Sequence, residues 1–379
     1  MSYKSAVKLT QKLVSVNSVS ASGNMGIARL LIPYLEGLGF DVECHPRNHT
    51  NLNLIARLGG QDARYGGLAF VGHLDTVPYE SEREKWGCHP LGGLIEDGKI
   101  WGVGTADMKG PIAAAIFAAK RYTKEVLRRP FVLYLTDGEE VGHTGAKWLL
   151  AHGLLDPKEV RHAIVGEPTS LVPVSTHLGI GETDVIVYGK GGHGSETHLG
   201  DNANERAAEV ILGLKELRIA LEGERHKTFE YLYPALNIGI MQGGTAKNKI
   251  PQEAVVKVQY RTFPGHEPGY VHNRVAGVVE EIAAKSGFEV KICHLRDDPG
   301  FETPADSELV RFLEELTGKR SSGVNFSTEA TELQQAGIEP VVLGAGSIKT
   351  AHRPNEFVPL EELLQSEEMY AKAIRVFCK

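Results

Sequence analysis

The chain has 379 residues, 42% of them hydrophobic and 23% charged, which is typical of a globular protein with two or three domains. Its net charge of −7, without any Lys/Arg-rich run, argues against a nucleic-acid or anionic-membrane partner, and no apolar stretch approaches the roughly 20 residues that cross a bilayer. Met1 to Leu13 lacks a signal-peptide pattern and the four cysteines are widely spaced, so we expect a cytoplasmic protein with reduced thiols.

Helical and strand patterns alternate along the first part of the chain. Helices are predicted over residues 5–16, 25–38, 111–122 and 145–152, and strands over residues 52–58, 68–71, 131–135 and 162–165. The strands are almost continuously apolar, as expected for strands that are buried on both faces. This pattern predicts an α/β domain with a mostly parallel sheet and helices on both faces.

The pattern changes near Thr176. Strands are predicted over residues 181–188, 235–241, 254–260 and 288–293, and helices over residues 202–221 and 268–286. This order is the split βαβ layout of a ferredoxin-like α+β domain. A helix over 307–317, a strand over 340–344 and a helix over 360–377 then resume the α/β pattern. We therefore expect one α/β domain (residues 1–175 and 294–379) that is interrupted by an inserted domain (residues 176–293).

Histidines and carboxylates occur where this α/β domain would gather them. Most follow the carboxyl ends of predicted parallel strands, where open α/β sheets bind ligands, and one precedes a helix. They are His73, Asp75, Asp107, Glu139, Glu140, Glu167 and His352. Adjacent acids such as Glu139 and Glu140 need a nearby cation if they are buried together. Two imidazoles, several carboxylates and one further carboxylate as a base are the inventory of a two-metal hydrolytic site.

Each of these residues alone has a plainer interpretation. Asp107 could be a carboxylate at a helix N-terminus, and Glu139 with Glu140 could be a solvated acidic pair. Glu167 could be a turn residue between Gly166 and Pro168. Because chemistry and predicted position agree at every one of them, the set favours a metal site.

Five motifs carry a resemblance to a known family, and it covers essentially the whole chain. They are Gly72–Pro78 (GHLDTVP), Gly104–Gly110 (GTADMKG), Asp137–Glu140 (DGEE), Gly166–Ser170 (GEPTS) and Gly344–His352 (GAGSIKTAH). In this order they resemble the co-catalytic zinc deacylases and aminopeptidases, a family that includes acetylornithine deacetylase, succinyl-diaminopimelate desuccinylase and carboxypeptidases.

The resemblance implies two divalent metal ions. His73, Asp107 and Glu167 would bind one ion, and Asp107, Glu140 and His352 the other, so that Asp107 bridges them. Imidazole and carboxylate ligands suit zinc, with cobalt or manganese as alternatives.

The resemblance also implies roles around these ions. Asp75 would accept the second ring N–H of His73, and Glu139 would act as general base. The Asp107–Met108 peptide would be cis, as in relatives.

In the inserted domain, Gly189–Ser195 resembles the family segment whose histidine reaches the active site of the partner subunit. His193 is therefore expected to stabilise an oxyanion across a homodimer, with an ordinary loop histidine as the alternative. Asn248 and Arg261 match positions that hold the substrate carboxylate, a role that suits the forked guanidinium. Gly346 is also expected to contact the substrate.

The implied activity is deacylation of an N-acyl amino acid. Residues 174–179, 325–330 and 351–356 look closer to acetylornithine deacetylase than to desuccinylases. The desuccinylases have two adjacent arginines where this chain runs Thr176 to Gly179. We therefore expect hydrolysis of N2-acetyl-L-ornithine to L-ornithine and acetate, in arginine biosynthesis. Succinyl-diaminopimelate desuccinylase, acetylcitrulline deacetylase, another N-acyl amino acid deacylase and a dipeptidase remain alternatives.

Two other classes are disfavoured. An inactive scaffold on the same fold would usually lose a ligand or the base, and here all are present. A serine or cysteine nucleophile would need a nucleophile elbow after a strand or a cysteine with a base partner, and neither pattern is evident.

Overall fold

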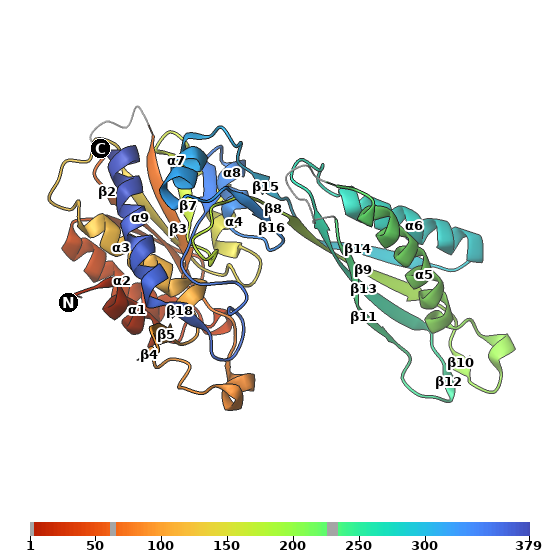
Figure 1. The fold of residues 1–379 in the computed structure, drawn as a ribbon. Helices are drawn as coiled ribbons and strands as arrows, with labels where there is room; N and C mark the ends of the chain where they lie inside the picture. The colour runs from red at the N-terminus through yellow and green to blue at the C-terminus, as the bar shows by residue number, and fades with distance from the viewer. Residues whose placement is uncertain (1–3, 61–65, 226–233) are drawn as a thin grey trace. The chain divides into compact units, whose positions relative to one another are not determined.

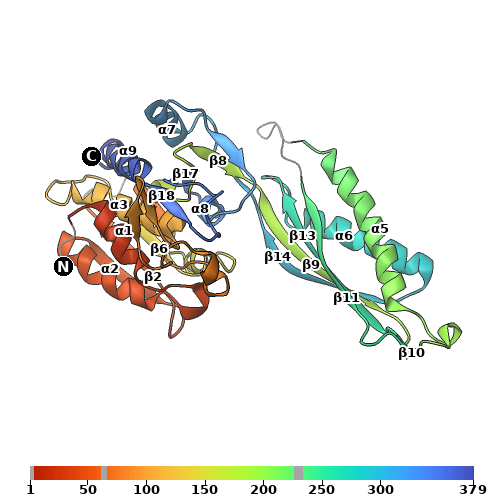
Figure 2. The same cartoon turned by 60° about the horizontal axis from the view of Figure 1, so that its bottom comes forward.

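The computed structural model describes residues 4–60, 66–225 and 234–379, which form two compact units (Figures 1 and 2). The first unit comprises Met1–Ser175, Thr303–Ser322 and Thr328–Lys379, and the second comprises Thr176–Glu302 and Gly323–Ser327. The second unit ends at Glu302 rather than at residue 293, because its last long strand continues to Asp298 and a further short strand follows.

The sheet of the first unit has the strand order β1-β2-β6-β3-β7-β17-β8. These strands are β1 (Asp41–Pro46), β2 (Leu52–Leu58), β6 (Phe131–Thr136), β3 (Gly67–His73), β7 (Val160–Val165), β17 (Glu339–Val342) and β8 (Val174–His177). The central four, from β6 to β17, are parallel, while β1, β2 and β8 pair antiparallel. The predicted parallel sheet is confirmed at its centre, where burial on both faces explains the apolar runs.

Helices cover both faces of this sheet (Figures 1 and 2). They are α1 (Ala6–Val14), α2 (Met25–Leu38), α3 (Gly110–Lys120), α4 (Thr144–Ala151), α7 (Glu308–Thr317), α8 (Ala330–Gln335) and α9 (Leu360–Cys378). Among the described residues, no helix is both long and apolar enough to cross a membrane.

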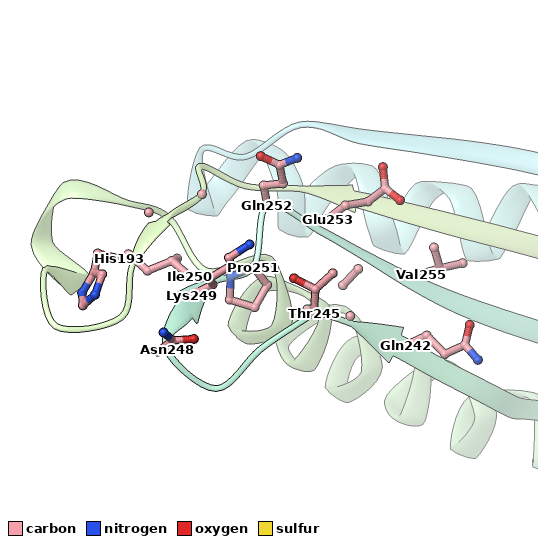
Figure 3. A pocket seen from close by; sticks show the side chains of 15 residues that line it. His193, Gln242, Thr245, Asn248, Lys249, Ile250, Pro251, Gln252, Glu253 and Val255 are labelled. Atoms are coloured by element: carbon pink, nitrogen blue, oxygen red, sulfur yellow. The ribbon is translucent and has the colours of Figure 1, made fainter.

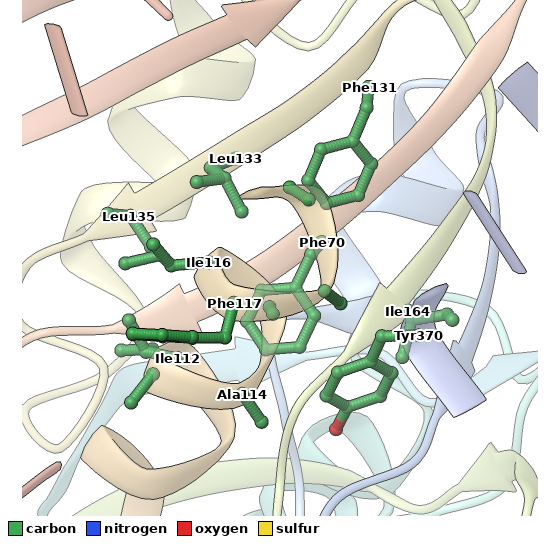
Figure 4. Packing of buried hydrophobic residues seen from close by; sticks show 14 of the residues in the cluster. Phe70, Ile112, Ala114, Ile116, Phe117, Phe131, Leu133, Leu135, Ile164 and Tyr370 are labelled. Atoms are coloured by element: carbon green, nitrogen blue, oxygen red, sulfur yellow. The ribbon is translucent and has the colours of Figure 1, made fainter. Parts of the chain in front are cut away.

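Helix α3 is buried along nearly its whole length. Its alanines allow close packing against α9, and Ile112 and Ile116 join Phe70, Leu133 and Tyr370 in the main hydrophobic cluster (Figure 4). This packing fixes the start of α3, and therefore the segment just before it, close to the ends of the central strands.

A small antiparallel sheet has the order β18-β5-β4. Its strands are β4 (Leu94–Glu96), β5 (Lys99–Trp101) and β18 (Phe357–Pro359). Val358 pairs with Ile100, so the chain shortly after His352 is joined to the chain shortly before Asp107.

The second unit contains a four-stranded antiparallel sheet with the order β11-β13-β9-β14. Its elements are β9 (Gly179–Tyr188), α5 (Ala203–Glu222), β11 (Leu236–Gly243), β13 (Glu253–Thr262), α6 (Tyr270–Ser286) and β14 (Val290–Asp298). Both helices pack on one face of the sheet (Figure 2). Alternate residues of β13 are buried, which matches a sheet with one covered face. The split βαβ layout is therefore confirmed.

Four short strands complete the fold: β10 (Gly192–His193), β12 (Lys249–Ile250), β15 (Phe301–Glu302) and β16 (Ser322–Val324). β10 pairs with β12 beyond the end of β9, whereas β15 and β16 pair with β8 where the chain connects the two units.

Candidate active site

Seven of the residues predicted for the site lie in the first unit, at the carboxyl ends of the central strands. His73 ends β3, and the other six lie in the segments that follow β3, β6, β7 and β17 or in the turn η4 (Thr105–Lys109) before α3. These six are Asp75, Asp107, Glu139, Glu140, Glu167 and His352. The parallel strands therefore gather residues from widely separated parts of the chain at their carboxyl ends, as the sequence predicts.

His73, Asp107 and Glu167 form the first candidate metal site, with ligand atoms within 4.8 Å of one another. Nε2 of His73 lies 2.8 Å from Oδ1 of Asp107 and 3.5 Å from Oε1 of Glu167. All three side chains are buried, and Oε1 of Glu167 has no hydrogen-bond partner among the described residues. A buried carboxylate oxygen without a donor fits a cation ligand, because its desolvation is otherwise uncompensated.

Asp107, Glu140 and His352 form a second group of the same kind. Nε2 of His352 lies 3.0 Å from Oε1 of Glu140 and 3.2 Å from Oδ2 of Asp107. The two oxygens of Asp107 thus face different histidines, an arrangement that allows this carboxylate to bridge two ions. Glu139 also has a carboxylate oxygen within 4.8 Å of ligand atoms of His73 and Glu140, so a further carboxylate lies beside the two groups.

The charges of these residues favour divalent cations. Burial raises the pKa of Glu139 to about 8 and raises the pKa of Glu140 and of Glu167, where repulsion from Asp107 adds to burial. Burial would also raise the pKa of Asp107, but hydrogen bonds from the two histidines outweigh it and the pKa is lowered. Hydrogen bonds to Asp107 and Glu140 raise the pKa of His352 to about 11. Four crowded carboxylates exceed the charge of two imidazoles, which fits metal ions.

Asp75 contacts His73 differently from the expectation. Nδ1 of His73 lies 3.0 Å from the backbone oxygen of Asp75, whereas the carboxylate is 3.6 Å away. Because a carbonyl only accepts, Nδ1 carries the hydrogen and Nε2 is left to face the metal site. The carboxylate of Asp75 instead accepts hydrogen bonds from the Ser20 hydroxyl at 2.6 Å and from the Glu139 amide at 3.2 Å. It therefore connects the end of β3 to the turn that carries Glu139.

Glu356 holds the segment of Asp107 and was not predicted. Its carboxylate accepts the backbone N–H groups of Gly104, Ala106 and Asp107 at 2.9–3.2 Å. The Asp107–Met108 peptide is cis, as expected. In the sequence, Glu356 is the last residue of the segment 351–356 that resembles acetylornithine deacetylase, and neither that resemblance nor its spacing from His352 indicates a contact with η4.

Arg47 was also missed. Its guanidinium makes a two-pronged contact with the buried carboxylate of Asp137, at 2.7 and 2.6 Å, and it donates to the Thr144 hydroxyl at 2.9 Å. Because Asp137 precedes Glu139 by two positions, this contact fixes the start of the turn after β6.

His193 and Asn248 lie together in the second unit, where they line a pocket of about 810 Å³ beside β10 and β12 (Figure 3). The backbone N–H of Ser195 donates to Nδ1 of His193 at 3.2 Å. Nδ1 is therefore an acceptor, and the neutral ring carries its hydrogen on Nε2. The side chain is exposed, so this N–H is available to an oxyanion.

Arg261 lies apart from that pocket. Glu253 at the start of β13 lines the pocket, and Arg261 is eight residues further along, or about 26 Å in a strand. Burial, and then repulsion from Arg296, lower its pKa, and Nη1 has no hydrogen-bond partner among the described residues. Arg261 is thus a partly buried cation, and the negative charge of Glu182 opposes these two effects on its pKa. It and Asn248 are too far apart to bind one carboxylate within a single chain.

Gly346 follows β17 with a φ of 89°, and an added Cβ would lie 2.7 Å from that of Ala106. Its N–H donates to Glu362 at 2.8 Å, and its carbonyl accepts the N–H of Ser170 at 2.7 Å. Both backbone groups are engaged within the first unit, so the contacts of Gly346 are with neighbouring segments of the protein.

Residues 69–376 match the family model described as peptidase family M20/M25/M40. The chain belongs to this family. Its M20 membership makes it a hydrolase and agrees with the cluster of histidines and carboxylates.

Two acetylornithine deacetylases are similar to this M20 chain over their full length. The protein of Myxococcus xanthus is 36% identical, with 97% of this chain and 96% of the relative covered, and that of Vibrio vulnificus (strain CMCP6) is 36% identical with full coverage of both. The solved structure of Bacillus subtilis YxeP, described as a dinuclear metal binding peptidase from the M20 family, superposes with a TM-score of 0.73. It covers 98% of this chain and 97% of its own at 18% identity, so it shows the shared fold.

Proposed function

We propose that the protein hydrolyses the amide bond of N2-acetyl-L-ornithine, giving L-ornithine and acetate. The observation that carries this proposal is the convergence of five metal-ligand side chains and one spare carboxylate, Glu139, at one sheet edge. The full-length similarity to acetylornithine deacetylases supports the choice of substrate.

In this proposal His73, Asp107 and Glu167 hold one divalent ion, and Asp107 shares the second with Glu140 and His352. Zinc suits these ligands, with cobalt as an alternative. Such ions, when bound, polarise the acyl carbonyl and lower the pKa of water.

The protein's own residues then move the protons. Glu139 takes a proton from the attacking water and delivers it to the departing amine, while the hydroxyl oxygen bonds to the acyl carbon and the C–N bond breaks. Nε2–H of His193 donates to the oxyanion, and Arg261 pairs with the substrate α-carboxylate.

The acyl preference rests on the segment from Thr176 to Gly179. A succinyl group would bring a second carboxylate that needs a cation. The Thr176 hydroxyl instead donates to the carbonyl of Phe301 at 2.8 Å, and Nδ1 of His177 lies 3.0 Å from the Leu178 carbonyl. Both side chains are buried and engaged with backbone groups, which favours a small acetyl group.

We also propose a homodimer that forms through the second unit. β11 is an edge strand, and Ile240 and Met241 on it are 45% and 41% exposed. An edge strand with exposed apolar side chains is a surface that a second copy could cover. The separation of Asn248 from Arg261 supports the same conclusion, since two chains could bring them to one substrate.

A place in cytoplasmic arginine biosynthesis agrees with this chemistry. The four cysteines, Cys44, Cys88, Cys293 and Cys378, are all free thiols. Free thiols are typical of a reducing compartment. The product of the proposed reaction, ornithine, is a precursor for arginine.

A panel of N-acyl amino acids tests the proposed function. Protein loaded with zinc or cobalt is incubated with N2-acetylornithine, N-succinyl-diaminopimelate, N-acetylcitrulline and N-acetylmethionine, and released acetate or succinate is measured. We expect the highest kcat/KM on N2-acetylornithine. A higher value on the succinyl compound would overturn the acetyl preference, and a marked preference for citrulline or methionine would overturn the substrate while keeping the chemistry.

A further inference from the structure

A buried histidine lies between two carboxylates next to the candidate metal centre. Nε2 of His143 is 3.4 Å from Oε1 of Glu139, and Nδ1 is 3.3 Å from each carboxylate oxygen of Glu332. The exposed fractions of His143 and Glu332 are 2% and 1%. Neither residue belongs to any group whose ligand atoms could hold an ion among the described residues.

The backbone brings the His143 ring to this position. His143 has a φ of 56°, in the left-handed region, and its N–H donates to the Glu139 carbonyl at 3.0 Å. The turn therefore folds back on the base, and α4 begins directly after it. Glu332 comes from α8, which packs against α4. The imidazole of His143 is thus positioned by a turn with a strained backbone and by the buried carboxylate of Glu332 from another helix.

The chemistry of the imidazole ring defines what this contact can do. A ring nitrogen without a hydrogen would turn its lone pair toward a carboxylate, which is repulsive. A hydrogen is therefore favoured on Nε2 beside Glu139, and by the same argument on Nδ1 beside Glu332. Glu332 on the other side orients the ring, as a carboxylate commonly does for a functional histidine. His143 can then contact Oε1 of Glu139, while the other carboxylate oxygen of Glu139 is available to accept a proton.

We propose that His143, oriented by Glu332, is a positioning residue that holds the carboxylate of Glu139 in the geometry required of a general base. The inference rests on the proposed role of Glu139 in hydrolysis. The alternative is a structural link between α4 and α8 without any effect on Glu139.

Double-mutant cycles on the metal-loaded protein separate these possibilities. We expect His143→Ala to lower kcat about 10–100-fold, as for other residues that orient catalytic groups, with KM nearly unchanged. The same substitution should cost little further activity in the Glu139→Gln background, because its effect passes through that carboxylate. Adding Glu332→Gln to His143→Ala should likewise cause little further loss of kcat. The matched control is His152→Ala, an exposed histidine at the end of α4.

Several results would overturn the proposal: an unchanged kcat in His143→Ala, losses that multiply with Glu139→Gln, or loss of metal from His143→Ala by elemental analysis. A second measurement does not depend on turnover or on the folding of the histidine variant. In holoprotein labelled with ¹⁵N-histidine, Glu139→Gln should shift the ring Nε2 resonance of His143 but not that of His152.

An unshifted His143 resonance would also overturn the inference. If instead the resonance shifts and no N-acyl amino acid is hydrolysed, the contact stands and the proposed function fails.

Discussion

The chemical properties of Glu139 depend on its burial and on the charges of its neighbours. Its carboxylate is not required to complete either group of three ligands around Asp107, yet it lies beside them. We predict that Glu139→Gln keeps two divalent ions per chain and loses about 10²–10⁴-fold in kcat, because an amide cannot accept the proton of water.

Elemental analysis and steady-state kinetics measure the two quantities. Glu125→Gln, which removes an exposed carboxylate paired with Lys379, is the control for an ordinary surface change. A near-native kcat, or the loss of an ion, would show that the role of Glu139 is misassigned.

At the scale of an element, the turn η4 depends on a single buried carboxylate from a distant part of the chain. Glu356 satisfies three backbone N–H groups around Asp107. We predict that Glu356→Gln weakens metal binding about 10–100-fold, because the residue orients a ligand without being one. The side-chain N–H₂ of the glutamine would also face one of these backbone N–H donors. That donor would lose its acceptor, which costs about 1–3 kcal/mol of stability.

Metal titration by calorimetry and thermal unfolding of the metal-free protein test this prediction. Unchanged metal affinity together with a lower Tm would mean that Glu356 supports the fold but not the ligand geometry. Glu96→Gln, in the exposed strand β4, is a suitable control.

For the whole molecule, the decisive question is whether a single chain is sufficient for activity. His193 presents an exposed Nε2–H. Asn248 lies just before β12, beyond the start of β13, whereas Arg261 lies near the far end of β13. We predict that His193→Ala and Glu139→Gln, each nearly inactive alone, recover about a quarter of wild-type activity when mixed and allowed to exchange subunits as a two-fold dimer. Half of the dimers would then be mixed, and each would contain one site with both residues intact.

Native mass spectrometry establishes whether subunits exchange in that experiment. Exchange without any recovered activity would place the action of His193 within its own chain, or remove it from the reaction.

The sequence by itself determined the elements and the inventory of the site. Apolar runs and helical periodicity depend on neighbouring residues, so the central strands and the split βαβ unit could be predicted from local patterns. The positions of His73, Glu139 and Glu167 followed from the same reasoning, because the ends of parallel strands gather at one edge of a sheet. Asp107 was expected just before the helix that begins near Pro111, and His352 after the strand at residues 340–344, while the family motifs supplied the division of the ligands between two ions.

Only the tertiary structure decided the contacts that orient these residues. The carbonyl of Asp75, rather than its carboxylate, fixes the His73 ring, and Glu356, Arg47 and Glu332 reach the site from remote segments. The antiparallel direction of β2 and β8 was equally hidden. Local patterns record whether a side chain is buried, whereas strand direction and polar partners depend on which distant segments the packed core brings together.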